Sequence, residues 1–378
     1  MEGMAAALGA LGLPLPEVLA QQAEPGQTND LQAFDYDGMA KLASNENPYG
    51  PSQAVIKAMQ EAVKYVHRYG YPDPGIVEAI ADHHKVWPEN ILLGAGSSEL
   101  LKVCDDVFLA QHKTLVGVDC TYESVFRFAT NSKADAIKVP ITEDYRTDIP
   151  GIIRAVKNNY RDIGLVYICN PNNPTGIVVP KQEIKRLIDN VPEDVPVLID
   201  EAYCHYVDNP NYEEAIPYVE KDRNVIVLRT FSKVAGLAGM RLGYAVARKD
   251  LIERMAPFAS GNYTTGGVNV LVKYAAVAAL KEMVNTTQIR KRTSDLRKKT
   301  VAELKAYGYD VIPSDANYFM VDIGEDVDVM SFEFQNHGIL VGRKFPPYDT
   351  WLRVSIGTED EMSRFVAAFK AILPAIKK

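Results

Sequence analysis

Several continuous apolar runs, each closed by polar residues, most constrain how the middle of this chain can fold. Residues 165–169, 197–200, 225–228 and 243–246 are such runs, and segments with helical spacing separate them. Unbroken apolar strands are buried on both faces, which is typical of mostly parallel sheets covered by helices. Ligands bind such sheets beyond the carboxyl ends of the strands. The pattern therefore predicts an α/β fold with a binding site at that edge.

The length predicts more than one domain. The chain has 378 residues, of which 47% are hydrophobic and 24% are charged, as in ordinary globular proteins. We expect a large domain at about residues 67–258, with a mostly parallel mixed sheet between helices. A smaller α/β domain is expected at residues 259–378. Residues 1–66 are expected to form an N-terminal arm and part of the small domain.

The charge balance disfavours polyanionic partners. Lys and Arg number 41 and Asp and Glu number 49, so the formal net charge is -8, opposite in sign to that of a typical nucleic-acid binder. A basic cluster at residues 290–299 lies in a helical pattern and is interpreted as a solvated helix face. No apolar run approaches the roughly 18 to 20 residues that span a membrane. We therefore expect neither a nucleic-acid nor a membrane partner.

The cysteines and the N-terminal segment bear on the compartment. The four cysteines are scattered and include no CxxC pair, which favours a reducing compartment and hence the cytoplasm. Because the histidines also form no HExxH motif, the sequence predicts no metal site. Residues 4–23 resemble the back half of an export signal, but the positively charged beginning is missing. Export is thus the alternative. We expect instead an N-terminal helix that packs on the body of the protein or on a partner subunit.

Residues 94–99 (Gly-Ala-Gly-Ser-Ser-Glu) lie between a predicted strand and a predicted helix. Glycines permit a tight turn, and free amides and hydroxyl groups at the start of a helix favour a phosphate. An ordinary strand-to-helix turn can have the same composition. This segment alone therefore leaves both interpretations open.

Residues 170–176 (Asn-Pro-Asn-Asn-Pro-Thr-Gly) form an unusually long run of turn residues. Two X-Pro steps and a final glycine define an irregular loop whose asparagine side chains can be directed at a ligand. A simple turn needs only one Asn-Pro or Pro-Gly pair. The run therefore favours a functional loop.

Asp200 closes an apolar run, and Tyr203 follows it by three residues. A carboxylate at a buried strand end is costly unless it is paired. A cationic partner, such as a protonated heterocycle, would stabilise it. The alternative is that Asp200 caps the N-terminus of a helix.

Lys233 follows another of these strands and has unusual neighbours. Thr230 and Ser232 precede it by three residues and by one, and Arg241 follows it by eight. A lysine near phosphate-binding hydroxyl groups and a fixed cation can have a lowered pKa and act as an amine nucleophile. An ordinary surface lysine is the alternative, which this set of neighbours disfavours.

Together these four segments predict a phosphorylated, cationic heterocycle that forms a Schiff base with a lysine, and pyridoxal phosphate meets that description. In these motifs the chain resembles the fold-type I pyridoxal-phosphate-dependent aminotransferases of class I/II. Within them it is most similar to the histidinol-phosphate aminotransferases. The resemblance runs from about residue 40 to the end, and it also rests on residues 44–51, 71–74, 121–122 and 352–358.

The resemblance implies a role for each motif residue. Lys233 would bind the cofactor and carry the substrate proton, and Asp200 would keep the pyridine nitrogen protonated. Asn173 and Tyr203 would bind the 3-oxygen of the ring, and Tyr122 would stack on the ring. The other implied cofactor-binding residues, mostly around the phosphate, are Gly96, Ser97, Ser98, Thr230, Ser232 and Arg241. Tyr71 would reach the phosphate of the neighbouring subunit's cofactor, which implies a homodimer.

The residues implied for substrate binding are Arg353, Asn45 and Arg343. Arg353 would bind a carboxylate in a bidentate manner, and an ordinary surface salt bridge is its alternative. In the family a second arginine directly follows a Gly-Ile strand near the C-terminus, whereas Arg343 is displaced by one residue. On a strand such a shift turns the side chain to the other face, so either a bulge restores its direction or the pocket binds a different group. Residues 259–267 also depart from the family pattern. Both departures bear on which substrate is bound, and neither affects the prediction of transamination.

The sequence thus predicts an aminotransferase of amino-acid biosynthesis that acts between an amino-acid-like donor and a 2-oxo acid. The implied pair is histidinol phosphate and 2-oxoglutarate. The alternatives are a transaminase for an aromatic or basic amino acid, a fold-type I lyase, decarboxylase or oxidative deaminase, and a non-catalytic binding module. The Arg353 clamp favours transamination over decarboxylation, and intact Lys233 and Asp200 argue against a non-catalytic protein.

Overall fold

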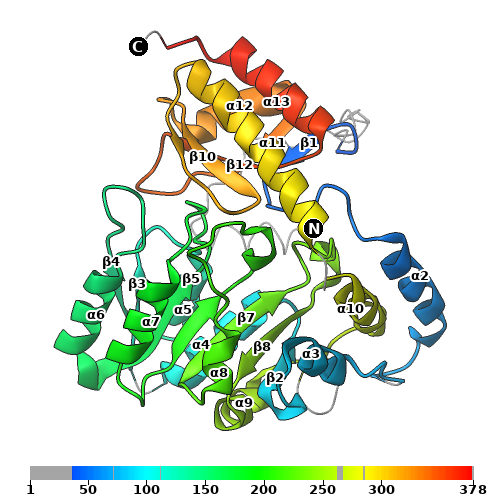
Figure 1. Ribbon diagram of the computed structural model, residues 1–378, viewed down its shortest axis with the longest axis vertical. Coiled ribbons are helices and arrows are strands. Elements are labelled where there is room, and N and C mark those ends of the chain that lie inside the picture. The colour runs from blue at the N-terminus through cyan, green and yellow to red at the C-terminus, as the bar shows by residue number, and fades with distance from the viewer. Residues whose placement is uncertain (1–35, 71, 111, 262–266, 284–285, 377–378) are drawn as a thin grey trace, which may run out of the picture. The chain divides into compact units, whose positions relative to one another are not determined.

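A seven-stranded sheet organises most of the protein in the computed structural model, which describes residues 36–70, 72–110, 112–261, 267–283 and 286–376 (Figure 1). The strand order is β2-β8-β7-β6-β5-β3-β4. Strand β8 runs antiparallel to both of its neighbours, and the other pairs are parallel. The strands are β2 (Ile91–Gly94), β3 (Thr114–Val118), β4 (Asp135–Val139), β5 (Ile163–Cys169), β6 (Val197–Asp200), β7 (Val225–Thr230) and β8 (Gly243–Ala247).

The sheet is buried on both faces, as the apolar runs predict. Along a strand the side chains alternate between two apolar clusters: Ile199 and Val227 belong to one, and Leu198 and Leu228 to the other. The first cluster includes residues of α3 (Ile76–His84), α6 (Ile149–Asn158), α7 (Lys181–Asn190), α8 (Ile216–Glu220) and α10 (Val270–Met283). The second includes residues of α4 (Ser97–Phe108), α5 (Ser124–Asn131) and α9 (Lys249–Met255). The predicted α/β class with a mostly parallel mixed sheet between helices is confirmed.

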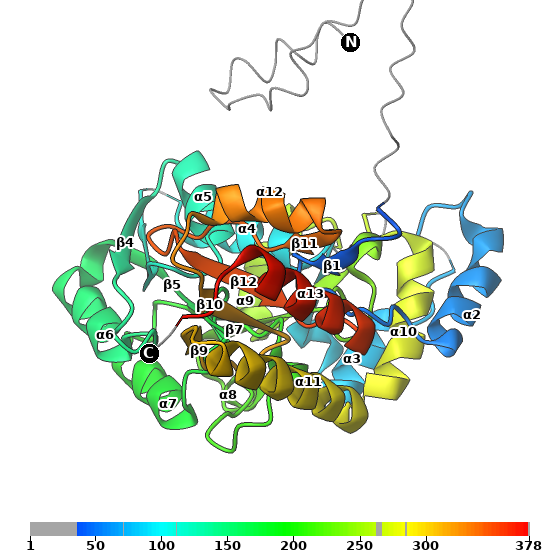
Figure 2. The ribbon, with the colours of Figure 1, turned by 90° about the horizontal axis from the view of Figure 1, so that it is seen from above.

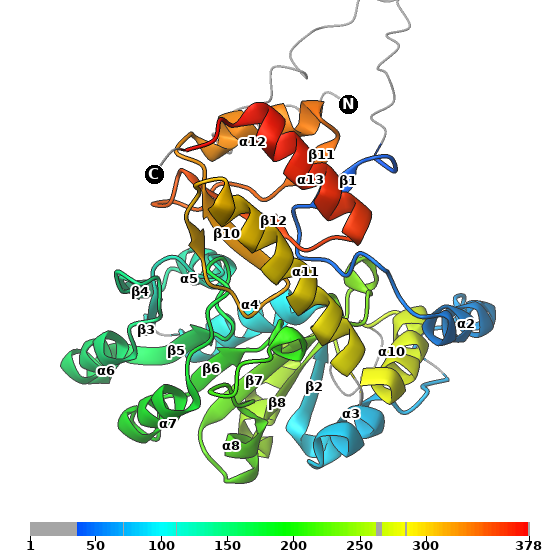
Figure 3. The same ribbon diagram turned by 45° about the horizontal axis from the view of Figure 1, so that its top comes forward.

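The C-terminal part forms a smaller α/β arrangement (Figure 3). Strands β9 (Val311–Ile312), β10 (Tyr318–Asp322) and β12 (Trp351–Ser355) form an antiparallel sheet in the order β12-β10-β9. Strand β1 (Ala40–Leu42) pairs in parallel with β11 (Ile339–Val341). Figure 2 shows these strands among helices that share one apolar cluster with them, α11 (Thr287–Ala306), α12 (Val327–Asn336) and α13 (Glu359–Ile372).

Two helices connect the sequence to local structure. Helix α2 (Gln53–Ala62) begins after Ser52, whose side chain caps the helix by accepting a hydrogen bond from the Val55 amide. The basic cluster lies on α11, where most of its side chains are exposed. Arg297 is the exception, because it is buried and donates to the Ala316 carbonyl oxygen. The solvated-face interpretation is therefore wrong for Arg297.

The described helices include none with the length and apolar character needed to cross a membrane. All four cysteines are buried free thiols. Within the described part of the chain, no group of three or more His, Cys, Asp or Glu side chains is arranged to hold a metal ion. Residues 4–23 and Tyr71 lie outside the described residues.

A buried carboxyl group on α4 makes a prediction about stability. Asp105 is fully buried, and neither of its carboxyl oxygens has a hydrogen-bond partner among the described residues. Burial, with a smaller contribution from Asp106, raises the pKa of Asp105 to about 8. A carboxyl group whose pKa is higher in the folded protein stabilises the fold at acidic pH, and this stabilisation is lost as the pH rises towards 8.

Asp105→Asn removes this ionisation while keeping the shape of the side chain. We expect the unfolding free energy of the variant to exceed that of the wild type by a margin that grows with pH, by up to about 1.4 kcal/mol per pH unit between pH 5 and 8. Urea unfolding of both proteins at pH 5, 6.5 and 8 measures the margin. A margin that stays constant with pH would contradict the prediction.

Candidate active site

A pocket of about 240 Å³ lies at the carboxyl ends of β5, β6 and β7, beside the N-terminus of α4. The sequence-predicted residues that line it are Ser97, Ser98, Tyr122, Asn173, Asp200, Tyr203, Thr230, Ser232, Lys233 and Arg241. Residues that the sequence analysis did not select also line it, namely Ser44, Glu46, Cys169, Ala202 and Ala238. The structure thus brings the four motifs together at the edge of the sheet where the strand pattern predicts a ligand.

One end of the pocket is suited to an anion. Gly96, the N-cap residue of α4, has a φ of 88°, and a Cβ there would lie 2.2 Å from Arg241 Nη2. Only glycine therefore allows the guanidinium to approach the helix N-terminus. Arg241 Nη1 donates to Ser232 Oγ at 3.3 Å, and Thr230 Oγ1 lies 3.0 Å from the same oxygen. Helix amides, hydroxyl groups and a guanidinium at one place favour a phosphate.

Asp200 lies on the pocket wall and is 3% exposed. Its Oδ1 accepts from the Ala202 amide at 3.2 Å, and its Oδ2 accepts from the Tyr167 hydroxyl at 3.3 Å. Burial raises the pKa of Asp200 to about 6, although these two hydrogen bonds and the Lys233 charge act in the opposite direction. The helix-cap alternative is wrong, because the next helical turn, η5 (Cys204–Tyr206), has Tyr203 as its N-cap residue.

Lys233 faces the pocket rather than the outer surface. Its Nζ donates to the Ser44 carbonyl oxygen at 2.9 Å and lies 5.6 Å from the centre of the Tyr203 ring. Burial lowers the pKa of Lys233 to about 8, and the charge of Arg353 contributes to this, while the carboxylate of Glu46 opposes it. At pH 7 about 10% of such an amine is neutral, against about 0.03% at the ordinary pKa. The surface-lysine alternative is therefore wrong.

Tyr203 is held by two asparagines. Its hydroxyl accepts from Asn45 Nδ2 at 3.2 Å and from Asn173 Nδ2 at 3.5 Å. Asn45 Oδ1 in turn accepts from Ser355 Oγ at 2.8 Å, so both ends of the Asn45 side chain are engaged. Asn45 therefore lies behind Tyr203 and outside the set of residues that line the pocket.

A second cavity, of about 480 Å³, contains both predicted arginines and shares Ser44 with the first. Arg353 is buried, with Nη1 donating to Asn173 Oδ1 at 2.7 Å and Nη2 to the Ala43 carbonyl oxygen at 2.6 Å. Its Nε has no partner in the described structure. The surface-salt-bridge alternative is therefore wrong for Arg353, whose pKa is lowered by burial.

Arg343 lies in the same cavity because β11 ends before it. The strand stops at Val341, so the face rule for strands does not apply to Arg343. The displacement by one residue therefore leaves Arg343 in this cavity. Gly342 passes close to β12, since a Cβ there would lie 2.6 Å from the Arg353 carbonyl oxygen. Arg343 Nη2 forms an ion pair with Glu123 at 2.9 Å.

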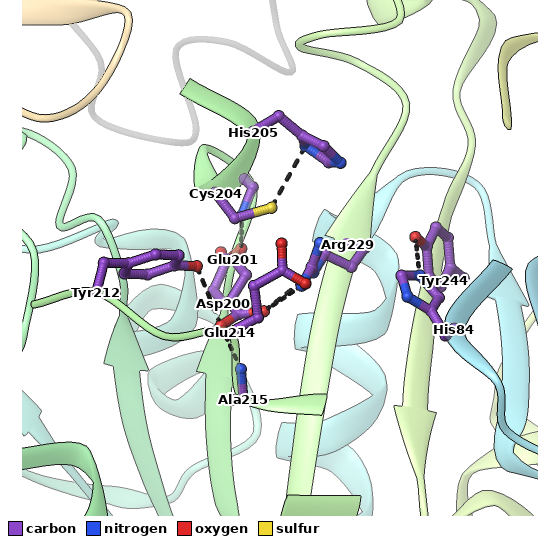
Figure 4. A network of polar contacts seen from close by, with 11 residues as sticks. His84, Asp200, Glu201, Cys204, His205, Tyr212, Glu214, Ala215, Arg229 and Tyr244 are labelled. Carbon is purple, nitrogen blue, oxygen red and sulfur yellow. Dashed lines mark hydrogen bonds and ion pairs between the residues drawn. The ribbon is translucent and has the colours of Figure 1, made fainter. Parts of the chain in front are cut away.

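A network of charged side chains adjoins Asp200, which lines the pocket (Figure 4). Glu201 Oε2 accepts from Arg229 Nε at 3.0 Å and Nη2 at 2.6 Å, and its Oε1 accepts from the Tyr212 hydroxyl at 3.2 Å and the Ala215 amide at 2.8 Å. Arg229 also pairs with Glu214 at 3.0 Å. Glu201 directly follows Asp200, and Arg229 directly precedes Thr230. The network therefore links the ends of β6 and β7.

The sequence analysis did not select Glu201 or Arg229. Burial raises the pKa of Glu201 to about 7, although the charge of Arg229 acts in the opposite direction. The available signal was the presence of two charged residues of opposite sign at the ends of neighbouring apolar strands. Because an unpaired buried charge is costly, such residues are expected to pair.

Comparison with known proteins identifies the class. The chain belongs to the family "Aminotransferase class I and II", whose model matches residues 37–369. It is therefore a pyridoxal-phosphate-dependent aminotransferase-family enzyme, as the motifs predict.

The chain is similar to several individual proteins of known name. The chain is 37% identical over 344 residues to the histidinol-phosphate aminotransferase of Moorella thermoacetica, covering 88% of this chain and 85% of that protein. A histidinol-phosphate aminotransferase from Sinorhizobium meliloti, solved in complex with pyridoxal-5'-phosphate, has a TM-score of 0.79 at 24% identity over 94% of this chain and 96% of the other. L-threonine-O-3-phosphate decarboxylase from Porphyromonas gingivalis has a TM-score of 0.72 at 19% identity over 88% and 98%. The fold alone therefore does not decide the reaction.

Proposed function

We propose that this protein transfers an amino group between histidinol phosphate and 2-oxoglutarate. The observation that carries the proposal is the pair Arg343 and Arg353 in one cavity beside the Lys233 pocket. Histidinol phosphate has a phosphate and 2-oxoglutarate has two carboxylates, and guanidinium groups bind both kinds of anion. The identity with the Moorella thermoacetica enzyme, at 37%, supports the same substrate.

The residues of the first pocket fit pyridoxal phosphate. The cradle of Gly96, Ser97, Ser98, Thr230, Ser232 and Arg241 suits its phosphate. Asp200 is buried and accepts hydrogen bonds from the Ala202 amide and the Tyr167 hydroxyl, and a protonated ring nitrogen would supply a cationic partner. Lys233 is the amine that would bind the aldehyde carbon. When bound, the cofactor supplies an electron sink for the electrons released at the substrate carbon.

The side chains around this group would do the remaining work. Lys233 Nζ would accept the proton from the substrate carbon and deliver it to the cofactor carbon that carried the aldehyde, because its lowered pKa makes the neutral amine available. Asp200 would hold a proton at the ring nitrogen. Asn173 and Tyr203 would bind the ring oxygen, and Tyr122 would cover the ring face and exclude water. Arg353, Arg343 and Asn45 would orient the substrate, Asn45 through its hydrogen bond to Tyr203.

The proposal extends to the assembly and the compartment. The family resemblance supports a homodimer in which Tyr71 reaches the neighbouring subunit's cofactor. It also supports a division of the chain into an N-terminal arm with part of the small domain (residues 1–66), a large domain (67–258) and a small C-terminal domain (259–378). Four buried free thiols support a reducing compartment such as the cytoplasm. Light scattering of the purified protein tests the dimer, and a mass of one chain would overturn it.

The test of the reaction is an absorbance titration of the cofactor-loaded protein with histidinol phosphate, without a 2-oxo acid. Conversion of the lysine-bound cofactor band to a pyridoxamine band supports both the half-reaction and the donor. An unchanged spectrum would exclude histidinol phosphate and lead to a panel of aromatic and basic amino acids. Absence of any cofactor band after loading would overturn the proposal.

Arg353→Gln tests the anion-binding role. Because the charge of Arg353 is buried, we expect its loss to lower kcat/KM for 2-oxoglutarate by roughly 10- to 100-fold, mainly through KM. Arg343→Gln is the matched comparison, and we expect a smaller loss because Arg343 is half exposed and paired with Glu123. Initial rates at varied 2-oxoglutarate measure both. An unchanged KM in Arg353→Gln would show that the acid binds elsewhere.

A further inference from the structure

Asp200 receives only one side-chain hydrogen bond from the described residues, and its donor is Tyr167. The Tyr167 hydroxyl lies 3.3 Å from Asp200 Oδ2, while Oδ1 accepts from the Ala202 amide. Tyr167 is fully buried and does not line the pocket. It therefore contacts the carboxylate from the side away from the cofactor site.

The sheet fixes this contact. Strands β5 and β6 are parallel neighbours, with Tyr167 opposite Leu198 and Cys169 opposite Asp200. Alternate residues of a strand share a face, so Tyr167 and Asp200 are diagonal neighbours on one face of the sheet, within reach of a long side chain. The position of the hydroxyl thus follows from strand register rather than from a loop.

In the hydrogen bond between Tyr167 and Asp200, the tyrosine hydroxyl is the donor and the carboxylate is the acceptor. Burial raises the pKa of the Tyr167 hydroxyl well above its ordinary value, so the group stays protonated and can donate to the carboxylate. A hydrogen bond to the ionised form of a carboxyl group favours that form over the neutral one. The ionised form is the one that can hold a protonated ring nitrogen.

We propose that Tyr167 is a positioning residue, which orients the Asp200 carboxylate towards the cofactor ring and keeps it ionised through the hydrogen bond to Oδ2. This inference rests on the cofactor role proposed for Asp200. Other titratable or charged groups also face Asp200, namely Cys169 on β5, Tyr203 after β6, Lys233 after β7 and Tyr318 on β10. All of them are unchanged in a Tyr167→Phe variant.

Tyr167→Phe removes only the hydroxyl group, and Tyr318→Phe is its matched control. Tyr318 is equally buried, its ring lies 5.0 Å from that of Tyr203, and its hydroxyl donates to the Asn172 carbonyl oxygen at 2.9 Å rather than to Asp200. Both substitutions delete a buried hydrogen bond near the pocket. Only the first removes a donor from the carboxylate.

The measurement is equilibrium dialysis of the apo proteins against pyridoxal phosphate between pH 5.5 and 8.5. We expect the Kd ratio of Tyr167→Phe to wild type to be near one at pH 8.5 and to rise to about tenfold at pH 5.5, because Asp200 then loses its charge at a higher pH. The Tyr318→Phe ratio is expected to stay flat with pH. In loaded enzyme, Tyr167→Phe is expected to lower kcat more than it changes KM.

Two outcomes would overturn the inference in distinguishable ways. Flat or equal ratios for the two variants, with a wild type that binds pyridoxal phosphate, would show that Tyr167 is only part of the core. A wild type that does not bind pyridoxal phosphate would overturn the proposed function and this inference together. Far-ultraviolet circular dichroism and melting temperature confirm that each variant is folded.

Discussion

Lys233→Ala is expected to abolish turnover, with kcat reduced by at least roughly a thousandfold. The variant lacks the amine that would bind the cofactor and carry the substrate proton. Among the described residues, Lys233 is the only lysine that lines the pocket, so no other lysine is positioned to replace it. Its lowered pKa, about 8, also distinguishes it from an ordinary lysine as a base near neutral pH.

The loss is expected to be chemical rather than structural. Lys233 Nζ donates one hydrogen bond, to the Ser44 carbonyl oxygen, and Ser44 lines the pocket, where water can replace the amine. The melting temperature of the apo variant should therefore stay close to that of the wild type. Addition of a small primary amine, such as methylamine, is expected to restore part of the activity. Appreciable turnover by Lys233→Ala without added amine would exclude the proposed mechanism.

The sequence could predict the sheet and the pocket because both depend on local pattern. An unbroken apolar run that ends in a polar residue identifies both a buried strand and its functional end, as at Asp200. Parallel pairing then places such ends side by side. This is why the residues of four separate motifs meet in one pocket although they are far apart in the chain.

Cross-strand partners could not be predicted in the same way. Tyr167 lies inside an apolar run and reads as an ordinary strand residue, and its contact with Asp200 depends on the register of β5 and β6. For Arg229 and Glu201 the opposite charges indicated a pair, but their contact also requires that β6 and β7 are neighbouring strands. A sequence pattern indicates which face a residue occupies but not which residue of the neighbouring strand lies opposite.

The position of Arg343 depended on a strand boundary. The alternation rule is valid within a strand, and β11 ends at Val341, two residues before Arg343. Strand ends depend on tertiary pairing, here on β1, whose Leu42 pairs with Val341 at the end of β11, and sequence patterns define them poorly. Tertiary packing also decides the place of Asn45. The sequence could select Asn45 as a site residue but could not predict that it contacts the Tyr203 hydroxyl instead of lining the pocket.

Asp200→Asn is expected to affect activity and stability in opposite directions. The amide cannot hold a proton at the ring nitrogen by charge, so we expect kcat/KM to fall by several orders of magnitude, at least roughly a thousandfold. In the apo protein, however, burial raises the pKa of Asp200 to about 6. A carboxyl group of this kind destabilises the fold at neutral pH, since the stabilisation from its neutral form is lost as the pH rises through 6.

Removing this ionisation should therefore stabilise the apo protein at pH 7.5, by on the order of 3 kcal/mol. Urea unfolding of apo wild type and apo variant measures the gain, and steady-state rates with loaded enzyme measure the loss. Asp105→Asn is the matched control, because it also removes a buried carboxylate but lies outside both cavities, and it is expected to be stabilised and fully active. An Asp200→Asn enzyme with wild-type turnover would refute the ring-nitrogen role. An active-site carboxylate that lowers the stability of the free protein is retained because it binds a ligand. Unchanged or lower stability of apo Asp200→Asn would therefore contradict the proposal that Asp200 destabilises the free protein.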